Sequence, residues 1–151
     1  MERDFAYAEI SGNSNYPDIT GLVSFIQYPY YVKVSLFLEN IPKDRFLGFH
    51  IHEGTNCSGN SEDEFADAKT HYNPDNSDHP DHAGDLPSIY SYDGKARMTF
   101  NTDKFLVKDI LGKTIILHEN PDDFRSQPAG DAGDKIACGE ITHQYLGALA
   151  Q

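Results

Sequence analysis

The clearest hydrophobic pattern lies at residues 32–39, where apolar and mostly polar positions alternate. Four aliphatic residues, from Val32 to Leu38, occupy every second position of this segment. A period of two predicts a β-strand with one buried face. The apolar run at residues 21–27 predicts a partner strand. Pro29 lies between the two segments and favours a turn there, because proline cannot donate a backbone hydrogen bond.

Shorter apolar runs predict further strands. They cover residues 5–10, 48–52, 95–99, 114–118 and 137–142. Asp93-Gly94 is a turn signal just before one of these runs. No segment sustains the helical period of 3.6. Several short strands separated by turn residues predict an all-β sandwich or barrel.

Two long segments, residues 56–87 and 120–135, are polar, contain proline and glycine, and show little strand pattern. Loops of this length are uncommon in a compact domain unless they are functional or disordered, and metal binding would give the first one a reason to be ordered. There is no repeat, linker or second domain. The sequence therefore predicts a single domain over residues 1–151.

Charge narrows the classes of partner. The 151 residues include 12 Lys and Arg against 24 Asp and Glu, a formal net charge of −12. This balance argues against nucleic acid or an anionic membrane as the main partner. No apolar stretch approaches the 18 residues of a membrane span. The N-terminal residues are charged and lack the apolar segment of a signal peptide, which predicts a cytoplasmic protein or a mature form whose signal has been removed.

The histidines carry the candidate chemistry. His50 and His52 lie two apart on a predicted strand, so their side chains share one face while Phe49 and Ile51 point to the core. His118 ends another predicted strand and could supply a third ligand.

The long first loop holds a second group, His71, His79, His82 and Asp85. Six of the seven histidines are thus clustered, whereas His143 has no clustered partner and is interpreted as an ordinary surface or hydrogen-bonded residue. Nitrogen-rich ligation favours zinc or copper, and the lack of clustered cysteines argues against iron–sulfur and thiolate zinc sites. The two cysteines, Cys57 and Cys138, are compatible with two reduced buried thiols or with one long-range disulfide.

Taken together, these motifs resemble the copper–zinc superoxide dismutase family. The matching stretches are Gly48-Phe-His-Ile-His-Glu53, His71-Tyr-Asn-Pro74, His79, His82-Ala-Gly-Asp-Leu-Pro87, His118-Glu119, Pro121-Asp-Asp123 and Gly133-Asp-Lys-Ile-Ala-Cys-Gly139. They occur in the family's order, and the joint match is specific. The resemblance implies a Greek-key β-sandwich or flattened barrel of about eight antiparallel strands, with two long functional loops.

The resemblance also implies two metal cofactors, copper and zinc. The implied copper ligands are His50, His52, His71 and His118. The implied zinc ligands are His71, His79, His82 and Asp85. His71 would be shared, with one ring nitrogen toward each metal, and would supply a proton as superoxide is disproportionated to dioxygen and hydrogen peroxide.

Further roles follow from the same resemblance. Asp122 would accept hydrogen bonds from one copper-binding and one zinc-binding histidine, His50 and His79, whereas Asp123 would be an ordinary solvated acid. Cys57 and Cys138 fall where the family has a disulfide.

Lys135 occupies the position of the family's arginine and would attract the anionic substrate as a point charge, without arginine's planar fork. Because a net charge of −12 repels superoxide, a local positive field is needed, and its expected sources are the metals, Lys135 and Arg125.

This chain departs from the family in its loops, which are short in a bacterial-like way. A homodimer is expected by resemblance, and a copper-loading partner is possible, but the short loops leave the dimer interface open. The alternative function is a non-catalytic metal-binding or copper-handling homologue. A zinc hydrolase is a weaker option, because no positioned general base stands out beside the histidines.

Overall fold

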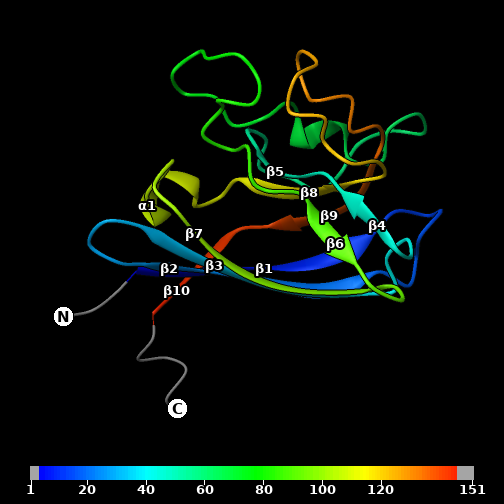
Figure 1. The fold of residues 1–151 in the computed structure, drawn as a ribbon, viewed down its shortest axis with the longest axis horizontal. Coiled ribbons are helices and arrows are strands. Elements are labelled where there is room, and N and C mark those ends of the chain that lie inside the picture. The colour runs from blue at the N-terminus through cyan, green and yellow to red at the C-terminus, as the bar shows by residue number, and fades with distance from the viewer. Residues whose placement is uncertain (1–3, 146–151) are drawn as a thin grey trace.

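The computed structural model describes residues 4–145, which form one curled antiparallel sheet and a small second sheet (Figure 1). The eight strands of the curled sheet are β1 (Asp4–Gly12), β2 (Thr20–Gln27), β3 (Val32–Glu39), β5 (Phe49–His52), β7 (Lys95–Thr102), β8 (Thr114–His118), β9 (Lys135–Glu140) and β10 (Thr142–Tyr145). The small sheet pairs β4 (Arg45–Leu47) with β6 (Ile89–Ser91). The expected all-β fold of about eight antiparallel strands is confirmed.

The strand order β5-β8-β9-β1-β2-β3-β7, with β10 also on β1, brings together segments far apart in the chain. Figure 1 shows β5 and β8 lying above the layer formed by β1, β2 and β3. Apolar side chains between these layers form the core, and the alternation in β3 places Val32, Val34, Leu36 and Leu38 in it.

The shortest elements contain too few residues to show a periodic hydrophobic pattern in the sequence. β4 and β6 have three residues each, α1 (Val107–Ile110) has four, and the 3-10 turn η1 (Ala66–Ala68) has three. The predicted strand at 137–142 is in fact two strands, β9 and β10. Ile141 separates them because its N–H donates to the Lys113 carbonyl, outside the strand ladder. Within residues 4–145, no helix is long and apolar enough to cross a membrane.

Both long loops, residues 53–88 and 119–134, lie on the same side of the molecule, beyond β5 and β8 (Figure 1). The fold thus places the end of β8, one face of β5 and both loops around one region.

Candidate metal centre

Strand β5 presents its two histidines on one face, as its alternation predicts. His50 and His52 are buried, as are Phe49 and Ile51, which alternate with them, because one face meets the core and the other meets the loops. His118 ends β8, the strand paired with β5. The Nε2 atoms of His52 and His118 lie 3.3 Å apart. The prediction that these side chains converge is correct.

The first long loop returns to β5 and delivers the remaining histidines. Isolated bridges pair His52 with His71 and His50 with Asp85. The Ile51 N–H donates to the Gly84 carbonyl at 2.9 Å. A Cβ on Gly84 would lie 2.3 Å from the Ile51 carbonyl oxygen, so glycine is required for this close approach.

Asp85 lies at the centre of the loop's ligand group. Its Oδ1 is 2.8 Å from His71 Nδ1, and its Oδ2 is 3.0 Å from His79 Nδ1 and 3.2 Å from His82 Nδ1. The four side chains are buried.

Two groups of four ligand atoms result, each with its members within 4.8 Å of one another. One comprises His50, His52, His71 and His118, and the other comprises His71, His79, His82 and Asp85. His71 belongs to both groups. These are the copper and zinc ligand sets that the sequence resemblance implies.

Hydrogen bonds on the far side of each ring show which nitrogen faces inward. His52 Nδ1 lies 2.9 Å from the Lys69 carbonyl oxygen, and His118 Nδ1 lies 3.2 Å from that of Gly133. A carbonyl can only accept, so both Nδ1 atoms donate and both neutral rings turn an Nε2 lone pair inward. Two lone pairs 3.3 Å apart repel unless a cation lies between them, so this arrangement fits a bound metal ion.

Buried atoms without a hydrogen-bond partner also indicate bound metal ions. Within residues 4–145, four buried side-chain nitrogen or oxygen atoms have no hydrogen-bond partner. Three of them are His50 Nδ1, His71 Nε2 and His79 Nδ1. Buried polar groups are normally paired, and these three nitrogens face the two ligand groups. The residues present therefore fit one metal ion in each group.

The electrostatics keep the rings in their ligating form. Burial, followed by the charges of neighbouring imidazoles, lowers the pKa of His118 from 6.5 to about 3. Burial likewise lowers the pKa of His50 and, more strongly, of His52. Burial alone would raise the pKa of Asp85, but its hydrogen bond to His71 and the nearby imidazoles lower it below 3.8. Neutral imidazoles and an ionised carboxylate are the forms that bind metals.

Asp122 links the two groups from behind. Its Oδ2 accepts from His50 Nε2 at 2.7 Å and its Oδ1 from His79 Nε2 at 2.8 Å. Burial opposes ionisation, but these hydrogen bonds and one from the Phe124 N–H lower the pKa of Asp122. The carboxylate thus fixes two tautomers at once. Asp123, in contrast, is exposed and accepts only from its own turn, including Ser126.

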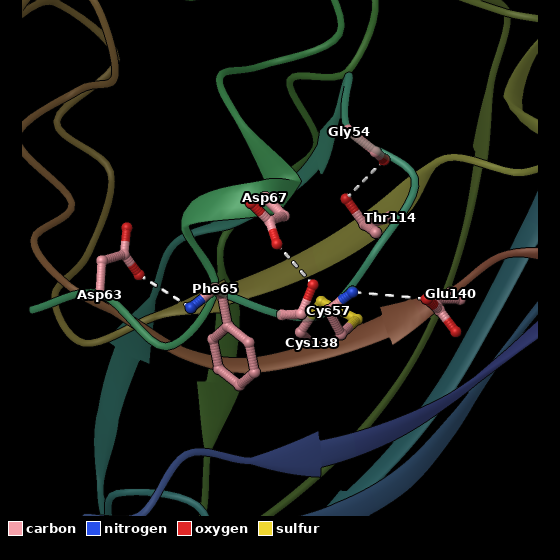
Figure 2. Close-up of a disulfide and its surroundings, with 9 residues drawn as sticks. Gly54, Cys57, Asp63, Phe65, Asp67, Thr114, Cys138 and Glu140 are labelled. Atoms are coloured by element: carbon pink, nitrogen blue, oxygen red, sulfur yellow. Dashed lines mark hydrogen bonds between the residues drawn. A yellow bond between two sulfur atoms is a disulfide. The ribbon is translucent and has the colours of Figure 1, made fainter. Parts of the chain in front are cut away.

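A disulfide joins Cys57 to Cys138, with Cα atoms 5.8 Å apart, so the alternative of two reduced thiols is wrong (Figure 2). Cys138 lies on β9 and Cys57 in the first long loop. Phe65 packs beside the bond in a small cluster with Ala68, Ile116 and Cys138. The link fastens the start of the loop to the sheet that carries the copper ligands.

A cavity of about 680 Å³ opens onto the ligand rings of His52, His71, His82 and His118. Lys135, at the start of β9, lies in its wall. Arg125 is exposed and lies outside this wall, in the turn after Asp123. His143 lies away from the centre, with its Nε2 3.8 Å from Asp4 Oδ1.

The sequence pattern does not predict three further residues of the site. Lys69 supplies the carbonyl that orients His52 and also lines the cavity. Asp63 accepts a hydrogen bond from Lys135. The Nζ of Lys104 donates to the carbonyls of Pro80 and Asp85, both at 3.1 Å, and so fastens the zinc-binding loop. Each contact joins segments distant in sequence, so no local sequence motif predicts it.

Comparison with known proteins points to one family. The family described as "Copper/zinc superoxide dismutase (SODC)" matches residues 19–141. Superoxide dismutase [Cu-Zn] 2 of Aquifex aeolicus is 36% identical over 151 residues, which covers 90% of this chain and 85% of the relative. Superoxide dismutase [Cu-Zn] 1 of the same organism is 38% identical over 136 residues, covering 80% and 79%.

Among solved structures, the Cu/Zn superoxide dismutase from Brucella abortus is similar in fold. Its TM-score is 0.79, with 24% sequence identity, and the match covers 90% of this chain and 98% of that one.

Proposed function

Because the chain belongs to the copper/zinc superoxide dismutase family, we propose that the cavity in front of His52, His71 and His118 is where it disproportionates superoxide to dioxygen and hydrogen peroxide. The observation that carries this is His71, a single ring whose two nitrogens face two different ligand groups. Copper bound by the first group supplies the one-electron redox chemistry that disproportionation requires, and that zinc lacks.

The residues around His71 have separate roles in this reaction. His79, His82 and Asp85 would hold zinc together with His71, and Asp85 Oδ1, 2.8 Å from His71 Nδ1, helps to fix the orientation of that ring. His71 Nε2 is buried without a hydrogen-bond partner and is the atom that takes up and releases a proton. Asp122 orients rings on both sides through its two hydrogen bonds.

Lys135 acts on the approach of the substrate. Its ammonium lies in the cavity wall, where it attracts an anion as a flexible point charge. It therefore affects the encounter with superoxide more than the redox step.

Metal analysis, copper EPR and superoxide decay on one sample test this function. Protein loaded with both metals should consume superoxide, and zinc-only protein should not. His118→Ala should alter the copper spectrum. A sample with full copper and zinc occupancy that leaves superoxide decay unchanged would instead establish a non-catalytic metal-binding homologue.

A second copy of the chain is the proposed partner. Phe46 and Tyr90, on β4 and β6, expose about half of their surface, and their rings lie 5.0 Å apart. An exposed aromatic patch of this kind supports a contact between copies. Sedimentation of the parent and Phe46→Ser would test it. A copper-loading partner and a cytoplasmic location stay predictions from the sequence.

A further inference from the structure

The lysine in the cavity wall already has a partner. Lys135 Nζ donates to Asp63 Oδ2 at 2.5 Å, across 72 residues of sequence. Both residues line the cavity that opens onto the ligand histidines. The Asp63 carboxylate is ionised at neutral pH: burial opposes this, but the hydrogen bonds from Lys135 and from the Phe65 N–H lower its pKa below 3.8.

Local contacts hold Asp63 in place. The Phe65 N–H donates to Asp63 Oδ1 at 3.0 Å, as Figure 2 shows, and the Asp63 N–H donates to Asn60 Oδ1 at 3.0 Å. The Phe65 ring is buried against Cys138, next to the disulfide. The carboxylate is therefore attached to a packed and covalently fastened segment.

Glu64, the next residue, attaches this segment to a second part of the chain. Glu64 accepts hydrogen bonds from the backbone N–H and the hydroxyl of Ser14, in the β1–β2 loop. Asp63 is thus held on both sides, whereas Lys135 reaches it through a flexible four-carbon stem. The position of the Asp63 carboxylate therefore sets the position of the Lys135 ammonium.

The charges of the cavity wall show why this ion pair affects the approach of an anion. The wall carries two lysines, Lys69 and Lys135, and four acids, Glu62, Asp63, Glu64 and Asp134. An anion that approaches Lys135 meets an ammonium that is already neutralised and a carboxylate that repels it. Arginine's five donors could satisfy both partners, but lysine's compact ammonium must be shared between them.

We propose that Asp63 is a positioning residue that holds the Lys135 ammonium, so that superoxide must compete with this carboxylate for it. The identity of the anion rests on the proposed function, whereas the competition itself does not. Removing the Asp63 charge while keeping its shape should release Lys135 toward the cavity and make small anions bind more readily.

Asp63→Asn tests the proposal, because asparagine can still accept from the Phe65 N–H. Glu62→Gln is the matched control: it makes the same charge change one residue away in the same cavity wall. The first readout is trace acetylation of the metal-loaded protein, with Lys135 quantified by mass spectrometry against exposed Lys43. We expect Lys135 to react about two- to fivefold faster in Asp63→Asn, the size of effect typical of a partly exposed ion pair, and at the parent rate in Glu62→Gln.

The second readout is kcat/KM for superoxide at low salt, in the parent and in a Lys135→Met background. Asp63→Asn should raise kcat/KM about two- to fivefold in the parent and have a much smaller effect without Lys135. Unchanged Lys135 labelling, or equal rises in kcat/KM for both charge variants in both backgrounds, would overturn the proposal. If the metal-loaded parent consumes no superoxide, the proposed function fails, and the labelling result still decides the role of Asp63.

Discussion

Breaking the disulfide should destabilise the metal-free protein by an amount set by the length of the loop that the disulfide closes. Cys57 and Cys138 are 81 residues apart, and a cross-link closing such a loop removes about 15 cal/mol/K of entropy from the unfolded chain. At 25 °C this corresponds to about 4.5 kcal/mol of the free energy of unfolding. Small domains have only about 5–15 kcal/mol in total, so the loss should be large.

Guanidinium unfolding of the oxidised and the reduced metal-free protein measures this difference. Because the chain has nine tyrosines and no tryptophan, far-UV circular dichroism and tyrosine fluorescence are the suitable signals. Comparing one chain in two redox states avoids the cavity that a substitution at buried Cys138 would leave. In the control, a Cys57→Ala/Cys138→Ala double variant, reductant should have no effect.

A loss below about 1 kcal/mol would refute the reasoning, because it would mean that the unfolded chain gains almost no freedom when the link is cut. The effect should also reach the metal centre. The disulfide fastens the loop whose Lys69 carbonyl orients His52, so the reduced protein should release copper faster than the oxidised protein.

Asp122→Asn presents an amide N–H to one of two histidine rings in place of a carboxylate oxygen, so metal affinity should fall about 10- to 100-fold in chelator competition. Asp123→Asn, an exposed neighbour, should leave it unchanged, and equal affinities for the two variants would contradict the proposed role. Lys104→Met removes the hydrogen bonds to the carbonyls of the zinc-binding loop, so chelators should extract zinc several-fold faster than from the parent. Lys108→Met on α1 is the control, and equal extraction rates for the two variants would contradict this role of Lys104. Because His118 has a pKa near 3 when folded and near 6.5 when unfolded, the unfolded state binds more protons between these values. The contribution of His118 to the stability of the metal-free protein should therefore be complete above pH 6.5 and fall progressively as the pH drops toward 3; equal urea midpoints at pH 7.5 and pH 5 would exclude this.

The strands that the sequence predicts well are those long enough to show their period. β3 alternates over eight residues, and the same rule on β5 placed His50 and His52 on one face. β4 and β6 are three residues long, too short for any period. β9 begins two residues before the predicted strand, because Lys135 pairs with His118 although its side chain is polar.

The ligands themselves were predictable because metal coordination restricts residue type and spacing, and the resemblance added their pairing into two groups. The partners that orient or neutralise them were harder to predict. The pair Lys135–Asp63 spans 72 residues, and Lys104 reaches carbonyls about 20 residues away, which any residue type can supply. Only the folded chain brings such groups together.

The orienting groups imply that loop folding and metal binding form one equilibrium. His52 and His118 are oriented by backbone carbonyls of Lys69, in the first loop, and Gly133, in the second. Asp122, in the second loop, orients two more rings. The lone pairs therefore converge only when both loops have folded, and in the metal-free state their mutual repulsion opposes that folding. A bound metal ion converts the repulsion into attraction, so its binding free energy appears largely as the stability of these loops. The disulfide and Lys104 act on the same equilibrium from outside the centre, since each fastens a loop without contributing a ligand.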